Sequence, residues 1–128
     1  IEYVEMQLLA EVFVILQALG NNPDQIAHIF ESWKPIANSY LLETTIDILR
    51  KKEDNDWLIN KIMDKAGNKG TGNWTTIASA ELGVPSTLIA SALFSRYISF
   101  YKEERVLNNK NFRPSVLDDE VILILDIR

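Results

Sequence analysis

Several residue types are missing or scarce in this chain, and each absence excludes a class of protein. None of its 128 residues is cysteine, which excludes disulfide frameworks and thiolate metal sites. There is a single histidine and the acidic residues are scattered, so the sequence offers no metal-ligand constellation. The 13 basic residues are outnumbered by 18 acidic ones, and the net charge of −5 argues against a nucleic-acid partner.

Long apolar runs are also missing. The most apolar stretches, 8–19 and 84–98, are interrupted by polar or charged residues, and neither reaches the roughly 20 apolar residues that span a bilayer. No targeting peptide is visible, because Ile1 leads directly into a helical pattern without a basic segment. We therefore expect no membrane partner and a cytoplasmic location.

What the chain does contain is the pattern of one helical domain. Apolar residues recur at every third or fourth position after Met6, and Asn22-Pro23 is a typical helix start, with a capping side chain followed by proline. The second helix is expected to stop before Pro35. The predicted helices cover residues 1–19, 23–34, 38–52, 75–82, 85–108 and 116–128. The short apolar stretch 58–63 fits a helix or an extended segment. The sequence predicts an all-α fold.

The most informative segment reads Ile-Met-Asp-Lys-Ala-Gly-Asn-Lys-Gly-Thr-Gly-Asn-Trp over residues 62–74. Its glycines allow tight turns and bring backbone N–H groups close to a ligand. The Lys69 ammonium, the Thr71 hydroxyl and bare amides together suit a phosphate or another small anion. It is not a P-loop, because its lysine precedes the glycines. The structural alternative is an ordinary surface loop between two helices. In either case we expect Trp74 to pack beneath the loop and fix it to the following helix.

This segment resembles the signature of the decarboxylating 6-phosphogluconate dehydrogenase family. The family pattern is an aliphatic residue, any residue, Asp, two free positions, Gly-Asn-Lys-Gly-Thr-Gly, any residue and Trp, and every constrained position is met from Ile62 to Trp74. The resemblance continues through 1–7, 75–85, 88–89, 94–96, 102–105 and 125–128. One departure is Val4, which stands where the family usually has glycine; its effect on packing beside Glu2 stays open.

The resemblance implies the organisation of the chain. We interpret residues 1–128 as part of the all-helical, multi-helix C-terminal domain of this family, serving substrate binding and dimerisation. In the family a dinucleotide-binding Rossmann domain precedes this region and a tail follows it, and neither is in this sequence. The chain is therefore expected to be a truncated piece of a longer homodimeric enzyme.

The resemblance also implies an activity. It is the oxidation of 6-phosphogluconate by NADP and its decarboxylation to ribulose 5-phosphate and CO2, in the pentose phosphate pathway and gluconate utilization. The choice between NADP and NAD stays open, because the residues that make it lie upstream. The isolated chain is expected to be inactive.

The family's site residues carry over position by position. The resemblance assigns the general acid to Glu2, substrate and phosphate binding to Tyr3, Lys69, Thr71 and Arg96, and support of the loop to Gly70 and Gly72. Arg96 lies in an otherwise apolar stretch, so we expect a buried charge whose partner is either a ligand phosphate or an acidic side chain of the chain itself. Asp64 is expected to orient the loop.

Two alternatives come from other classes of protein. The chain fits a helical structural or dimerisation module without catalysis. Residues 76–89 also imitate the spacing of a DNA-binding helix-turn-helix, but residues 85–94 contain no basic side chain to contact phosphates.

Overall fold

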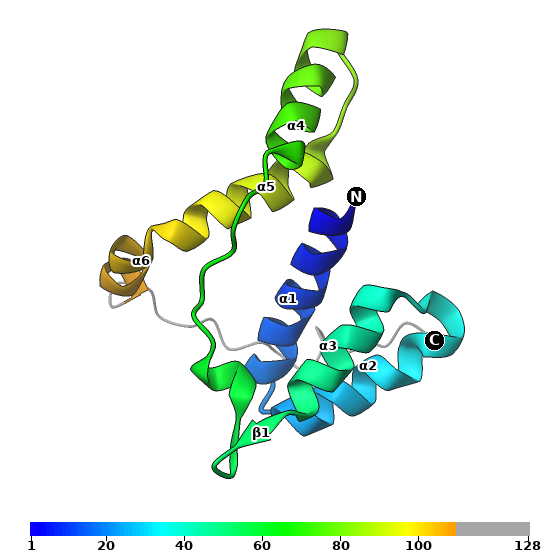
Figure 1. The fold of residues 1–128 in the computed structure, drawn as a ribbon, viewed down its shortest axis with the longest axis vertical. Helices are drawn as coiled ribbons and strands as arrows, with labels where there is room; N and C mark the ends of the chain where they lie inside the picture. Colours follow the sequence, from blue (N-terminus) through cyan, green and yellow to red (C-terminus); the bar gives the residue numbers. More distant parts are fainter. Residues whose placement is uncertain (110–128) are drawn as a thin grey trace.

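The computed structural model describes residues 1–109, and this part of the chain is built almost entirely of helices (Figure 1). The elements are α1 (Glu2–Ala18), α2 (Pro23–Ala37), α3 (Tyr40–Arg50), β1 (Lys52–Glu53), β2 (Asp56–Trp57), the 3-10 helix η1 (Leu58–Lys61), α4 (Thr71–Leu82), α5 (Thr87–Phe100) and α6 (Lys102–Asn109). The two short strands form an antiparallel hairpin. The all-α prediction is confirmed; the helix expected over 116–128 lies outside the described residues.

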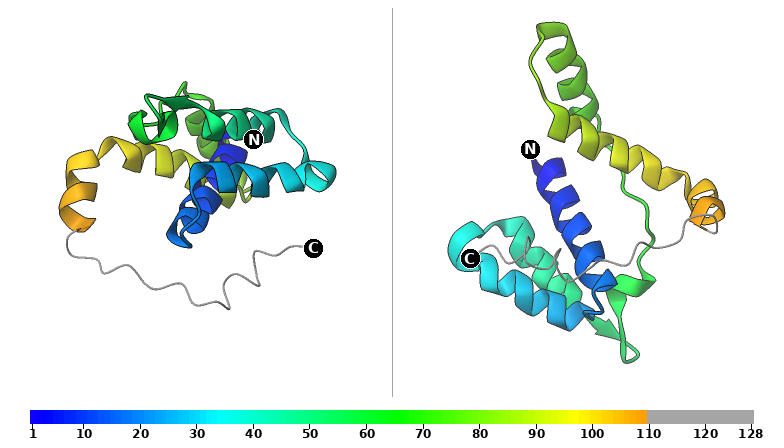
Figure 2. Two further views of the ribbon diagram at one scale, coloured as in Figure 1. Left: turned by 90° about the horizontal axis from the view of Figure 1, so that it is seen from below. Right: turned by 180° about the vertical axis from the view of Figure 1, so that it is seen from behind.

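The helices form two groups joined through α1. Helix α2 packs on α3 at one end of the molecule, while α4 packs on α5 at the other, and α1 contacts both α2 and α5. The α4–α5 hairpin extends away from the α2–α3 pair in Figure 1 and in the right view of Figure 2. As a result, the N-terminal turn of α1 lies beside the hairpin. Within residues 1–109, no helix is both long and apolar enough to cross a membrane.

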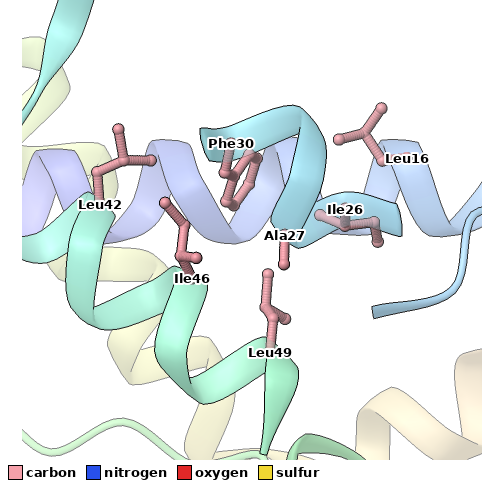
Figure 3. Packing of buried hydrophobic residues seen from close by; sticks show 7 residues of the cluster. All are labelled: Leu16, Ile26, Ala27, Phe30, Leu42, Ile46 and Leu49. Carbon is pink, nitrogen blue, oxygen red and sulfur yellow. The ribbon is translucent and has the colours of Figure 1, made fainter. Parts of the chain in front are cut away.

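The main hydrophobic core lies between α1, α2 and α3 (Figure 3). Its buried members are Leu16, Ile26, Ala27, Phe30, Leu42, Ile46 and Leu49. On α2 and α3 they recur at spacings of one, three or four residues, which places them on one face of each helix. Phe30 is fully buried, and its ring centroid lies 5.0 Å from that of Trp33.

Local signals start these helices as the sequence predicts. The Asn22 side chain accepts a hydrogen bond from the Gln25 amide (2.9 Å), and the Gln25 side chain accepts one from the Asn22 amide (2.8 Å), which forms a capping box. The Ser39 hydroxyl caps α3 by accepting a hydrogen bond from the Leu42 amide.

The predicted ends of the second and fifth helices are wrong. Helix α2 continues through Pro35 to Ala37. It tolerates proline there because the missing N–H costs one hydrogen bond in the last turn, where few further bonds depend on it. The predicted helix 85–108 is interrupted at Tyr101, whose ψ of 54° is not helical. The Arg105 side chain donates to the Ser99 carbonyl (3.1 Å), and thereby satisfies a backbone acceptor at the break.

Candidate functional site

The glycine-rich segment ends directly in a helix. Gly70 has a φ of 97°, in the left-handed region, and it is the N-cap of α4, which begins at Thr71 rather than at residue 75. No side chain of the described residues caps this end. The first amides of α4 have no intrahelical acceptor, and the helix dipole adds positive potential there. Free amides and a positive potential of this kind are chemically suited to an anionic group.

Asn68 connects the loop to two helices. Its Oδ1 accepts hydrogen bonds from the Gly70 amide (2.8 Å) and from the Tyr3 hydroxyl (3.4 Å). Its Nδ2 donates to the Tyr97 hydroxyl on α5 (3.1 Å). The Tyr3 hydroxyl also accepts a hydrogen bond from the Lys69 backbone amide (3.2 Å). The Asn68 side chain is therefore the point at which α1, the loop and α5 meet.

Arg96 lies on the same network, and within residues 1–109 it forms no ion pair with an acidic side chain. Its guanidinium stacks on the Tyr3 ring, with Cζ 3.8 Å from the ring centroid, and Nη1 donates to the Gly67 carbonyl (2.6 Å). The remaining Nη2 lies 3.3 Å from the Met6 sulfur. Arg96 is only half-buried, so the predicted buried charge is wrong. Stacking on a ring face and a carbonyl acceptor stabilise the cation without a carboxylate.

Gly72 allows a close approach between α4 and Tyr3 of α1. It is buried, and a Cβ at this position would lie 2.8 Å from Cε2 of Tyr3 and 3.2 Å from Cδ1 of Leu93. Any side chain at residue 72 would therefore push the Tyr3 ring away from the loop.

A surface hollow of about 270 Å³ lies between the starts of α1 and α4. Its lining residues are Ile1, Glu2, Tyr3, Thr71, Gly72, Thr75 and Ile89. The structure thus brings Glu2 and Thr71 to one hollow and places Lys69 and Arg96 beside it around Tyr3. The Glu2 and Lys69 side chains are both exposed. Thr75 and Ile89 were not expected from the sequence, because only packing aligns them with Glu2.

Asp64 anchors the beginning of the loop to α6. Its carboxylate accepts hydrogen bonds from Lys102 Nζ (2.8 Å) and Arg105 Nη2 (3.1 Å). The hydrogen bond from Lys102, followed by that from Arg105, lowers the pKa of Asp64 from 3.8 to about 2. A second tie is the Ala66 amide, which donates to the Ser99 hydroxyl (3.0 Å). These contacts agree with the expected orienting role of Asp64.

The expectation that Trp74 packs beneath the loop is wrong. Its side chain is 74% exposed. Gly72 faces Tyr3 and Leu93, and a residue two positions later on a helix lies about 200° further around the axis. Because α4 already includes residue 72, Trp74 points to the opposite side. No group of three or more histidine, acidic or cysteine side chains within residues 1–109 is arranged to hold a metal ion.

Comparisons with known proteins match this chain to one family. Residues 1–124 match the family described as "6-phosphogluconate dehydrogenase, C-terminal domain". The chain is 46% identical over 122 residues to the decarboxylating 6-phosphogluconate dehydrogenase of Lactococcus lactis subsp. cremoris, covering 92% of this chain and 26% of that protein. It is 48% identical over 110 residues to the NAD(+)-dependent decarboxylating enzyme of Bacillus subtilis, covering 83% of this chain and 24% of that protein.

A comparison with solved structures finds a protein of the same family. The chain superposes on 6-phosphogluconate dehydrogenase of Plasmodium falciparum with a TM-score of 0.84 and 40% identity, covering 92% of this chain and 27% of that one. That protein was solved in its apo form, with its cofactor NADP+ and with its substrate 6-phosphogluconate. This chain spans about a quarter of the length of the relatives it matches.

Proposed function

The chain belongs to the 6-phosphogluconate dehydrogenase family, with residues 1–124 matching its C-terminal domain, and on that premise we propose that it supplies the phosphate site and the general acid of a decarboxylating 6-phosphogluconate dehydrogenase. The enzyme would convert 6-phosphogluconate to ribulose 5-phosphate and CO2 in the pentose phosphate pathway. NADP, bound by a dinucleotide-binding domain outside this chain, would accept the hydride. We assign to this chain only binding and proton transfer.

The observation that carries the proposal is the loop that ends in the uncapped start of α4. The substrate phosphate would lie against the first amides of α4, next to the Thr71 hydroxyl and the Lys69 ammonium. Tyr3 is already tied to this loop through its hydroxyl. Arg96 would complete the site by exchanging the Gly67 carbonyl for a phosphate oxygen, which a guanidinium binds with two N–H groups.

Glu2 is the proposed proton donor at the other end of the substrate. It lines the hollow that also contains Thr71, so a molecule bound by its phosphate at the loop would extend along this hollow toward Glu2. There the carboxylic acid would protonate the enediol left by loss of CO2. Because Glu2 is exposed, the exclusion of water from this proton transfer would come from other parts of the enzyme.

The assembly belongs to the same proposal. We infer a cytoplasmic homodimer, and large apolar side chains of the hairpin are available for an interface, since Trp74, Leu82 and Leu88 are each more than 60% exposed. The same exposure favours the second candidate, a structural or dimerisation module. A DNA-binding module is not favoured, because Arg96 is the one basic residue of α5 and it stacks on Tyr3.

The proposal is tested by titrating the 128-residue chain with 6-phosphogluconate and, as the phosphate-free control, gluconate. We expect amide NMR shifts at Gly70, Thr71 and Arg96 with the phosphorylated ligand only. Lys69→Ala should weaken binding about tenfold. The matched control is Lys65→Ala. Lys65 belongs to the same segment but lies over the Phe100 ring, so its substitution should leave binding unchanged.

Two results would contradict the proposal. Equal shifts with gluconate would show that the phosphate is not what the loop recognises. NADP reduction by the pure chain, lost in Glu2→Ala, would show that the chain needs no other domain.

A further inference from the structure

Asn68 is the residue that joins the parts of this site, although neither the family resemblance nor the loop composition assigned it a role. We propose that Asn68 is a positioning residue, which sets the turn at Gly70 and the place of the Tyr3 hydroxyl so that the start of α4 faces the anion. The inference rests on the proposed phosphate site and names the residue that shapes it.

The first step of the argument is the turn itself. The hydrogen bond from the Gly70 amide to Asn68 Oδ1 (2.8 Å) joins residues two apart, which is the pattern of an Asx-turn. It holds Gly70 at its left-handed φ of 97° and orients its amide toward the Asn68 side chain. The chain can then enter α4 at once, and the amides of the first α4 turn are the ones left for a ligand.

The second step is the orientation of the Asn68 amide. Tyr97 Oη accepts from Nδ2 (3.1 Å), so the opposite atom, Oδ1, faces Gly70 and the Tyr3 hydroxyl. A flipped amide would set Nδ2 against the Gly70 N–H, donor against donor. Tyr97 is anchored in α5, one residue after Arg96, and it therefore fixes the loop relative to the helix that carries Arg96.

The third step explains why an uncharged side chain suits this position. An aspartate could accept the same hydrogen bonds from Gly70 and Tyr3, and it could take the Tyr97 proton in place of donating to it. It would also place a negative charge beside Lys69 and the proposed phosphate. Asparagine supplies the turn without that repulsion, so exchanging it for aspartate separates turn geometry from anion binding.

The test compares Asn68→Ala, Asn68→Asp and Tyr97→Phe in the 128-residue chain. Hydrogen exchange of the Gly70 amide reports the turn without any ligand, and 6-phosphogluconate titration reports binding. In Asn68→Ala we expect exchange at Gly70 to accelerate and affinity to fall, both about three- to tenfold, as for a lost hydrogen bond. In Asn68→Asp the protection of Gly70 should persist while affinity falls about tenfold, a loss that shrinks as salt is added.

Tyr97→Phe should weaken binding less than Asn68→Ala, because the turn bond survives while its orienting partner is lost. The controls are Asn108→Ala and Tyr101→Phe, two exposed side chains outside the network, which should leave both readouts unchanged.

Two outcomes would overturn the inference: unchanged Gly70 exchange in Asn68→Ala, or unaltered affinity in Asn68→Asp. Failure of the unsubstituted chain to distinguish 6-phosphogluconate from gluconate would instead refute the phosphate site. The exchange of Gly70 in Asn68→Ala would then still decide whether Asn68 sets the turn.

Discussion

Gly72→Ala is the substitution that most directly tests the close packing at the site. Gly72 is buried in the first turn of α4, where the added methyl group would lie 2.8 and 2.9 Å from two atoms of the Tyr3 ring and 3.2 Å from Leu93. The ring cannot swing aside freely, since Arg96 stacks on it and its hydroxyl is held at the loop. Leu93 is only 1% exposed, so it is held in the packed interior.

The expected magnitude follows from two opposing terms. Inserting a methyl group into a packed site costs about 1–3 kcal/mol. Replacing glycine by alanine within a helix returns about 1 kcal/mol through helix propensity. We therefore expect Gly72→Ala to lower the free energy of unfolding by roughly 1 kcal/mol, and to weaken 6-phosphogluconate binding because Tyr3 is displaced.

Gly67→Ala is the matched control. Nothing lies within 4 Å of a Cβ at Gly67, and its φ is outside the left-handed region. That exchange should be neutral or stabilise by about 0.4–1 kcal/mol, through the unfolded state. Urea unfolding of both variants gives the comparison, and an amide spectrum shows whether the Lys69 N–H still contacts Tyr3.

Equal unfolding free energies for Gly72→Ala and Gly67→Ala would refute the packing argument. So would a Gly72→Ala chain that binds 6-phosphogluconate as tightly as the unsubstituted chain.

Two further predictions concern the loop anchor and the core. Because the folded-state pKa of Asp64 is about 2, below its ordinary 3.8, its ion pairs with α6 stabilise the fold above pH 3.8 and are lost as pH falls toward 2. Asp64→Asn should therefore flatten the unfolding free energy across that pH interval, measured by urea titration at each pH. Phe30→Ala should cost about 3–5 kcal/mol in thermal or urea unfolding, because Phe30 is fully buried between α2 and α3.

Each of these has its own control. Glu103→Gln removes an exposed carboxylate from the same helix that anchors Asp64, and it should keep the original pH profile. An unchanged profile in Asp64→Asn would contradict the assigned cause. Phe94→Ala truncates a ring that is 52% exposed, so it should lower the free energy of unfolding much less than Phe30→Ala. Equal losses of unfolding free energy would contradict the position of Phe30 in the main core.

Local signals account for what was predicted correctly. Helix starts at Asn22 and Ser39 depend on side chains within three residues of the amides they cap, so they are legible in the sequence. The glycine segment and its family were recognisable for the same reason, since the motif is contiguous. The break at Tyr101 was missed, because its compensating bond comes from the Arg105 side chain and not from a proline or glycine.

By itself, the sequence determined that this protein is all-helical, that it belongs to the 6-phosphogluconate dehydrogenase family, and that residues 62–74 form its candidate anion-binding segment. Only the tertiary structure decided how that segment is held. Tyr3, Asn68 and Tyr97 come from three distant segments, and they meet because α1 packs against α5. That same packing directs Arg96 onto the Tyr3 ring. Contacts of this kind depend on the relative positions of helices, which the spacing of residues along one helix does not specify.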